Sequence, residues 1–200
     1  MRSPRQLVLI GLGVILCSGC VSQVATRVNT FRASGPMAAS AAIAVTAQDT
    51  AQTKSLEFDF YKTRVEQALV KQGFRVANLR DAQYVAQLDY GVKRLDINKG
   101  SGMHTGFLTS GARGPVGMGA GVVVVDDNKN TPVFERKIGL VIAENNADAK
   151  RIYETTGVSE GACGVLSEVF DDMLAAVFAE FPAANGGSKT IKIKSSSACH

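Results

Sequence analysis

The chain offers few side chains from which a catalytic site could be built. It has two histidines and four cysteines among 200 residues. Hydrolase chemistry needs a nucleophile, a base and a group that orients the base. His104 is the one histidine inside the body of the chain, because His200 is at its end. We therefore expect His104 to be a structural or exposed residue and expect no catalytic residues.

Motifs for nucleotides and metal ions are also missing. No G-x-G-x-x-G fingerprint occurs, and no Gly-Lys-Ser/Thr sequence completes a P-loop. Two pairs of adjacent carboxylates, Asp126-Asp127 and Asp171-Asp172, are typical of a turn and of the polar side of a helix. The sequence therefore predicts no metal site and no nucleotide cofactor.

Residues 1–20 have the three parts of a secretion signal. Arg2 and Arg5 form a positive region, residues 7–16 are apolar, and the small residues Ser18 and Gly19 precede Cys20. The apolar run is too short to span a bilayer, which needs about 20 apolar residues. We expect residues 1–19 to be a cleaved signal peptide, with an ordinary signal peptide or an uncleaved anchor as the alternatives to a lipoprotein signal.

Ser18-Gly19-Cys20 resembles the lipobox of bacterial lipoproteins. The resemblance implies that Cys20 carries a diacylglycerol and an N-acyl chain, and that the membrane is a partner through this anchor. It departs from the pattern at Cys17, where an aliphatic residue is usual, with Leu16 shifted by one. Val21 stands where an aspartate would favour the inner membrane, so the resemblance implies an outer-membrane lipoprotein facing the periplasm. Several acyl chains make such anchoring stable.

After loss of the signal, residues 20–200 have a size that fits a single domain, with residues 20–23 as the lipid-anchored tether. The formal net charge of +4 falls to +2, because 20 basic residues then face 18 acidic ones. We expect no nucleic-acid partner at this balance. Lys189, Lys192 and Lys194 are predicted to form the solvated face of an edge strand, with lipid headgroups as the alternative contact.

Cys163 and Cys199 are the two cysteines that remain beside Cys20 in the mature chain. They have no metal-ligand spacing. An oxidising periplasm permits a disulfide between them. Two separate thiols are equally compatible with the sequence, because a bridge requires a Cα separation that spacing along the chain does not determine.

Hydropathy patterns predict three strands and one helix in the first half of the chain. Alternation of apolar and polar residues predicts strands over residues 21–32, 41–47 and 84–93. A helix is predicted over residues 56–72, because Tyr61, Val65, Ala68 and Leu69 lie on one face, and Gly73 ends it.

In the second half, residues 121–125 and 133–142 are predicted to form a hairpin across a polar turn at 126–130. Arg136 interrupts the core face of the later strand, and the other residues expected on that face are Phe134, Ile138, Leu140 and Ile142. A second helix is predicted over 159–181, regular from about Cys163 and stopped by Pro182. A last strand over 190–194 precedes a tail, residues 195–200, that we expect to fray.

This order of elements predicts an α+β fold: a mostly antiparallel sheet of about five to six strands with two amphipathic helices packed on one face. The chain also resembles Gram-negative lipoprotein domains of unknown function over residues 24–182. The resemblance is carried by Gln72-Gly73-Phe74, by the segment from Asp81 to Val85, by Val125-Asp126-Asp127 and by the segment from Phe178 to Pro182. It implies this fold and no activity.

Residues 100–121 contain eight glycines and form the most unusual internal segment. A long glycine-rich loop is either a mobile hairpin tip or a binding loop. Four larger side chains within it are candidate partner contacts: Met103, His104, Phe107 and Met118.

The function expected from these observations is a non-catalytic binding or structural module of the cell envelope, anchored by lipid and meeting another envelope protein. It would present either its uncovered sheet face or the 100–121 loop. The alternative is a small-ligand carrier or an enzyme with a pocket between the helices and the sheet.

Overall fold

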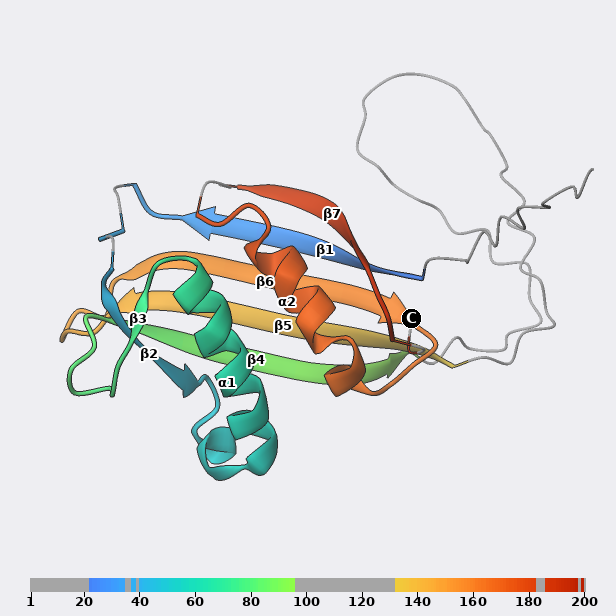
Figure 1. The fold of residues 1–200 in the computed structure, drawn as a ribbon, viewed down its shortest axis with the longest axis horizontal. Helices are drawn as coiled ribbons and strands as arrows, with labels where there is room; N and C mark the ends of the chain where they lie inside the picture. Colours follow the sequence, from blue (N-terminus) through green and yellow to red (C-terminus); the bar gives the residue numbers. More distant parts are fainter. Residues whose placement is uncertain are drawn as a thin grey trace, which may run out of the picture.

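A computed structural model describes residues 22–34, 37–38, 40–95, 132–182, 186–197 and 199 (Figure 1). Within these residues, seven strands form one sheet in the order β3-β2-β4-β5-β6-β1-β7. The strands are β1 (Gln23–Arg32), β2 (Ala42–Ala47), β3 (Arg75–Val76), β4 (Tyr84–Leu95), β5 (Val133–Glu144), β6 (Arg151–Gly161) and β7 (Gly187–Lys194). The helices are α1 (Leu56–Lys71) and α2 (Phe170–Phe178), with short 3₁₀ turns η1 (Thr50–Lys54) and η2 (Leu166–Glu168).

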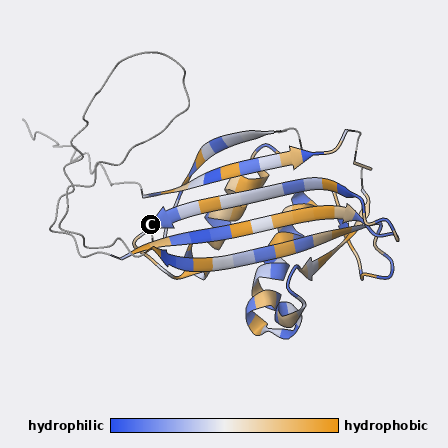
Figure 2. Cartoon of the chain, turned by 180° about the vertical axis from the view of Figure 1, so that it is seen from behind, coloured by the Kyte–Doolittle hydropathy of each residue, from blue (hydrophilic) through white to orange (hydrophobic). Residues whose placement is uncertain are grey.

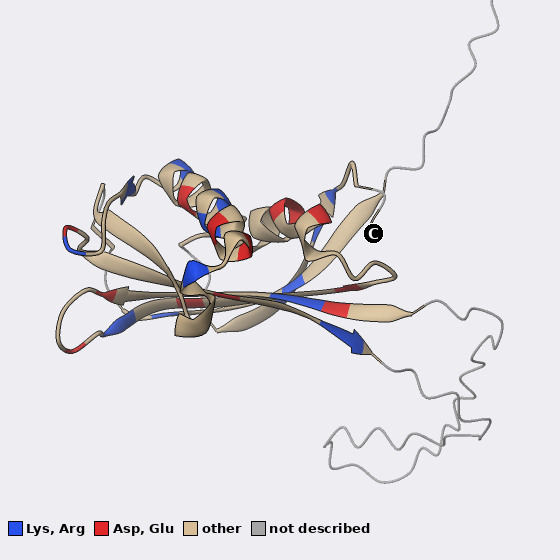
Figure 3. Cartoon of the chain, turned by 90° about the horizontal axis from the view of Figure 1, so that it is seen from below, with Lys and Arg blue, Asp and Glu red and all other residues tan. Residues whose placement is uncertain are grey.

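The α+β class is confirmed, and the two helices lie on the same face of the sheet (Figure 3). The sheet itself differs from the prediction, because it has seven described strands and is mixed. β2 runs parallel to both β3 and β4, whereas the remaining pairs are antiparallel. β2 and β4 are parallel because α1 and β3 connect them as a crossover, and parallel strands need such a connection. The two-residue β3 is too short to leave a periodic signal in the sequence.

Helix α1 confirms the predicted helix within one residue at its end. The Ser55 hydroxyl accepts a hydrogen bond from the Phe58 N–H at 3.0 Å, which satisfies one of the free donors of the first turn. Gly73 follows the last turn with φ of +93°, a conformation that favours glycine. The stripe buried against the sheet consists of Phe58, Tyr61, Val65 and Leu69.

The predicted helix over 159–181 is wrong in its first half. Residues 151–161 form strand β6, of which 151–158 had no predicted element and 159–161 were predicted as helix, and the helix is limited to Phe170–Phe178. The buried positions of β6 alternate strictly, as in a strand: Tyr153, Thr155, Gly157 and Ser159. Thr155, Gly157 and Ser159 are small and not strongly apolar, so the alternation of burial does not appear as an alternation of hydropathy.

Strand β5 confirms the predicted strand over 133–142. Its neighbours in the described residues are β4 and β6, and residues 121–125, predicted to pair with it, lie outside the described residues together with the turn at 126–130. Ile138, Leu140 and Ile142 are buried as expected. Phe134 is half-buried, because its ring lies near the end of the sheet beside Gly164.

The core fills the space between the helices and the covered face of the sheet. The Tyr61 ring of α1 stacks on Phe170 of α2 with centroids 4.2 Å apart and meets Tyr90 of β4 edge-on at 4.7 Å. Each such aromatic pair contributes about 0.5–1.5 kcal/mol beyond the area that it buries. The three rings therefore bind both helices to the middle of the sheet.

Gly157 is expected to set how closely α2 approaches β6. A Cβ atom at this position would lie 2.8 Å from Cγ2 of Val177 and 3.0 Å from Cγ2 of Thr26. Because both neighbours are buried, we expect Gly157→Ala to lower the free energy of unfolding by ~1–3 kcal/mol, the usual cost of overpacking. Urea unfolding measures the change. Gly91→Ala in β4, where nothing lies within 4 Å, is the control, and equal losses in the two variants would contradict the steric explanation.

Tyr61 is expected to make the fold sensitive to alkali. Burial, and then the nearby Glu57 carboxylate, raise the pKa of Tyr61 to about 12, from an ordinary value of about 10. The folded state favours the neutral phenol, so its contribution to stability is complete below pH 10 and is lost as the pH rises towards 12. We expect unfolding free energy to fall over this range, and Tyr61→Phe to show a shallower fall. An identical slope in the variant would exclude this role for Tyr61.

Candidate functional site

One end of the sheet gathers segments that are far apart in the sequence. At this end β1 begins at Gln23 opposite Lys194, the last residue of β7, while β4 ends at Leu95 opposite Val133, the first residue of β5. β6 also ends here, since Gly161 lies opposite Phe134. We call it the tether end, because Ser22, two residues after Cys20, lies at it.

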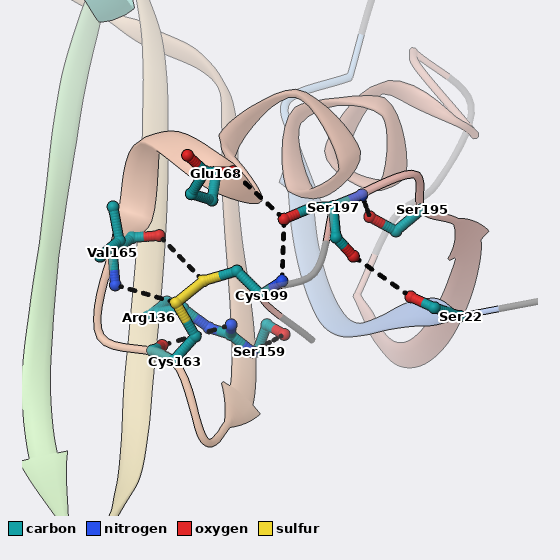
Figure 4. Close-up of a disulfide and its surroundings, with 9 residues drawn as sticks. All are labelled: Ser22, Arg136, Ser159, Cys163, Val165, Glu168, Ser195, Ser197 and Cys199. Atoms are coloured by element: carbon teal, nitrogen blue, oxygen red, sulfur yellow. Dashed lines mark hydrogen bonds between the residues drawn. A yellow bond between two sulfur atoms is a disulfide. The ribbon is translucent and has the colours of Figure 1, made fainter.

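The tail after β7 is bound to the tether end. The Ser195 N–H donates to the Ser22 carbonyl at 2.9 Å, and the Ser22 hydroxyl donates to the Ser197 carbonyl at 3.5 Å. The Ser197 hydroxyl donates to the Glu168 carboxylate at 3.3 Å (Figure 4). Residues 195–200 were predicted to fray, but the described residues of this tail, 195–197 and 199, are held against the body of the protein. The physical reason is a set of long-range hydrogen bonds that composition cannot reveal.

A disulfide joins Cys163 to Cys199, with Cα atoms 5.1 Å apart. The sequence left open whether these cysteines pair. The bridge connects the tail after β7 to the segment between β6 and η2, and Cys199 is buried (Figure 4). It therefore ties the segment that follows the edge strand β7 to the segment that follows β6, two positions away in the strand order.

Arg136 lies under this segment and is 1% exposed. Its Nη2 donates to the Ser159 hydroxyl at 3.1 Å and its Nη1 to the Cys163 carbonyl at 3.5 Å, but Nε has no partner in the described part of the chain. No carboxylate of those residues forms an ion pair with it. Burial lowers the pKa of the Arg136 guanidinium, because the charged form loses contact with water. Arg136 therefore fastens the segment that carries Cys163 to strand β6.

Residues 157–161 read Gly-Val-Ser-Glu-Gly, which is the spacing of a hydrolase nucleophile elbow and which the sequence analysis passed over. The structure places Ser159 within strand β6 rather than on a turn between a strand and a helix. Its side chain is 2% exposed and accepts the Arg136 hydrogen bond. This geometry makes Ser159 a buried structural residue, since an elbow presents its serine at an exposed turn.

The space between the helices and the centre of the sheet is a packed core, and the two clefts described here lie at its borders. A groove of about 520 Å³ runs between α1 and α2. Arg64 crosses it: its Nε lies 3.1 Å from the Asp171 carboxylate, and its guanidinium stacks 3.5 Å above the Phe60 ring. The lining of the groove is mixed: Leu174 and Phe178 are apolar, whereas Gln67 and Lys71 are polar.

A second, smaller cleft of about 270 Å³ separates α2 from β7. Tyr153 and Thr30 line it, and the Thr30 hydroxyl is 3.2 Å from that of Thr155. Burial raises the pKa of Tyr153, although hydrogen bonds to the two threonines oppose the rise. Glu180 and Lys189 form an ion pair along this cleft. It therefore combines a hydroxyl-bearing wall with a charged border.

The face of the sheet opposite the helices is not covered by any described element (Figure 2). It mixes both charge signs with apolar and small residues, and an ion pair of 2.7 Å between Lys137 and Asp89 crosses it. Side chains on this open face are at least partly exposed in each of four strands: Ala25, Arg27, Asn29 and Phe31 of β1, Gln87 and Asp89 of β4, Lys137 and Val141 of β5, and Glu154, Thr156 and Val158 of β6.

Lys192 and Lys194 are exposed on one face of the edge strand β7, as predicted. Lys189 is also exposed but lies on the other face of the strand, where it pairs with Glu180. The remaining predicted site residues, Cys20, Met103, His104, Phe107 and Met118, all lie outside the described residues.

No cluster of three or more His, Cys, Asp and Glu side chains suited to a metal ion occurs in the described ranges. Neither described helix has the length and apolar character required to cross a membrane.

No protein-family model and no curated protein matches the chain. Among solved structures it is similar to a PDZ domain protein from Parabacteroides distasonis, with a TM-score of 0.50 and 12% identity over 87% of this chain and 40% of that one. It is also similar to the PelC dodecamer from Paraburkholderia phytofirmans, at a TM-score of 0.40 and 13% identity over 78% of this chain and 99% of that one. A variant PelC dodecamer from the same organism gives 0.41 with the same identity and coverage. The likeness to the PDZ domain protein extends to the fold alone.

The disulfide is expected to stabilise the fold because it joins the tail after β7 to the segment after β6. We expect the double variant Cys163→Ser, Cys199→Ser to lose about 2–4 kcal/mol of unfolding free energy, a typical value for a bridge of this kind. Urea unfolding measures the loss, and the reducing agent dithiothreitol should produce it in the parent protein but not in the variant. If a thiol titration of the denatured, unreduced parent protein detects Cys163 and Cys199 as free thiols, the bridge is not formed.

Proposed function

We propose that this protein is a lipid-anchored lipoprotein of the cell envelope that binds another envelope component through the open face of its sheet. The observation that carries the proposal is the arrangement of the layers, in which both described helices cover one face and leave the other exposed (Figures 2 and 3). Exposed faces that combine apolar side chains with charges of both signs suit recognition of a protein partner.

Two observations support a location in the envelope. The lipobox-like sequence before Cys20 supports an acyl anchor on that residue. The Cys163–Cys199 disulfide supports an oxidising compartment, such as the bacterial periplasm, where bridges form and persist.

The described groups with shifted pKa values owe their shifts first to burial: Tyr61, Tyr90, Tyr153 and Arg136. Tyr61 and Tyr90 are core residues near the Glu57 carboxylate, and Arg136 is buried without a carboxylate partner among the described residues. Tyr153 also lines the cleft between α2 and β7. Because a shifted group in a cleft is a candidate functional residue, Tyr153 bears on the second candidate function.

A second candidate function, the carriage of a small ligand, rests on the cleft between α2 and β7. Its hydroxyl-bearing wall at Thr30 and Tyr153 could orient a polar group, while Val28 and Ile191 would contact an apolar part. A small molecule retained by the purified protein in native mass spectrometry would favour this candidate.

Photo-crosslinking in intact cells tests the proposed function. A benzoylphenylalanine probe replaces Thr156 at the centre of the open face, and the control probe replaces Thr53, an exposed threonine of η1. We expect a discrete adduct from position 156 and none from position 53, because only the first lies on the proposed binding face. Both probes are repeated in a Cys20→Ala background, which we expect to leave the membrane fraction and to lose the adduct.

Two outcomes would contradict the proposal at different points. If the Cys20→Ala protein remains in the membrane fraction, Cys20 is not the anchor. If the membrane-bound, folded protein gives the same adducts from both positions, or none from position 156, the open face is not the binding surface.

A further inference from the structure

The described part of the chain begins at Ser22, two residues after Cys20. Ser22 is held through both its carbonyl and its hydroxyl by the tail after β7. An extended chain spans at most about 3.6 Å per residue, so the two steps from Cys20 to Ser22 cover roughly 7 Å. If Cys20 is acylated, as the proposed function requires, no long linker separates the sheet from the lipid.

The tether end also presents apolar side chains to its surroundings. Val165, in the segment that follows Cys163, is 52% exposed, and Val92, near the end of β4, is 41% exposed. Figure 4 shows Val165 in the same cluster as the disulfide and Ser22. Exposed valines at the end of the sheet to which Ser22 belongs are suited to the interfacial region of a bilayer.

Charges at the tether end have both signs. In the strand register Lys93 lies opposite Glu135, which lies opposite Glu160. Arg94 follows Lys93, and Lys192 and Lys194 lie on the edge strand β7. Because Glu135, Glu160 and Glu168 offset most of this positive charge, the end has no strong requirement for anionic lipid. Zwitterionic headgroups meet such a surface without repulsion.

We propose that the tether end of the sheet rests directly on the lipid surface, with Val165 and Val92 in contact with it. The inference rests on the acylated Cys20 of the proposed function. It fixes the orientation of the domain: the strands rise from the membrane, and the opposite end of the sheet lies farthest from it. β4 alone is twelve residues long, which at 3.3 Å per residue carries its start about 40 Å from its end.

Tryptophan fluorescence tests this orientation, because the chain contains no tryptophan. The test variant is Val165→Trp. The matched control is Leu79→Trp, which is 50% exposed and lies just before the start of β4, at the opposite end. Each lipidated variant is reconstituted into phosphatidylcholine vesicles with and without brominated acyl chains, which quench a tryptophan that contacts them.

We expect the Val165→Trp protein to show a blue shift and loss of fluorescence in brominated vesicles, and the Leu79→Trp protein to show neither. The Val92→Trp variant repeats the test at a second site and serves if the first variant fails to fold, which thermal unfolding reveals. Mass spectrometry of the same samples reports whether Cys20 carries lipid. Two results with lipidated, folded protein overturn the inference but not the lipid anchor on Cys20. In the first, tryptophan fluorescence is quenched at neither valine position. In the second, it is quenched equally at residue 79. Absence of lipid on Cys20 overturns the proposed function itself, and this inference with it.

Discussion

A strand presents successive side chains to opposite faces, so a sheet with helices on one side has one buried and one exposed surface. In this protein the buried surface is completed by α1 and α2, which meet the sheet through the rings of Tyr61, Phe170 and Tyr90. The connections that place both helices on one side also leave the other face open. The proposed binding function follows from this asymmetry of layers rather than from any cluster of reactive groups.

The contacts at the tether end compensate for the short second helix. α2 has only nine residues. It therefore does not reach the ends of β4 and β6 on the face of the sheet that carries the helices. The segment from Cys163 to Glu168 and the tail after β7 fill that position, and the disulfide joins them. Arg136 lies beneath them at a cost in desolvation, which its hydrogen bonds to Ser159 and the Cys163 carbonyl partly offset.

Elements whose signal is local could be predicted from the sequence. Helix α1 has an apolar stripe, a capping Ser55 and a terminating Gly73, and strands β4 and β5 alternate in hydropathy where the helices cover them. Strand β6 has no such signal, because Thr155, Gly157 and Ser159 face inward. Small residues are required there because α2 lies so close that a Cβ on Gly157 would collide with Val177. A longer helix was predicted because the buried Leu166 and Val169, in and just after the 3₁₀ turn η2, continue the apolar spacing of α2.

The sequence by itself determined the α+β class, the position of α1, the alternation of three long strands and the exposure of the lysines on β7, because each depends on residues within a few positions of one another. Only the tertiary structure decided the parallel pairing of β2, the Cys163–Cys199 bridge, the burial of Arg136 and the binding of the tail to Ser22. Each of these joins segments distant along the chain. Their geometry depends on strand order and helix packing, which no local pattern contains.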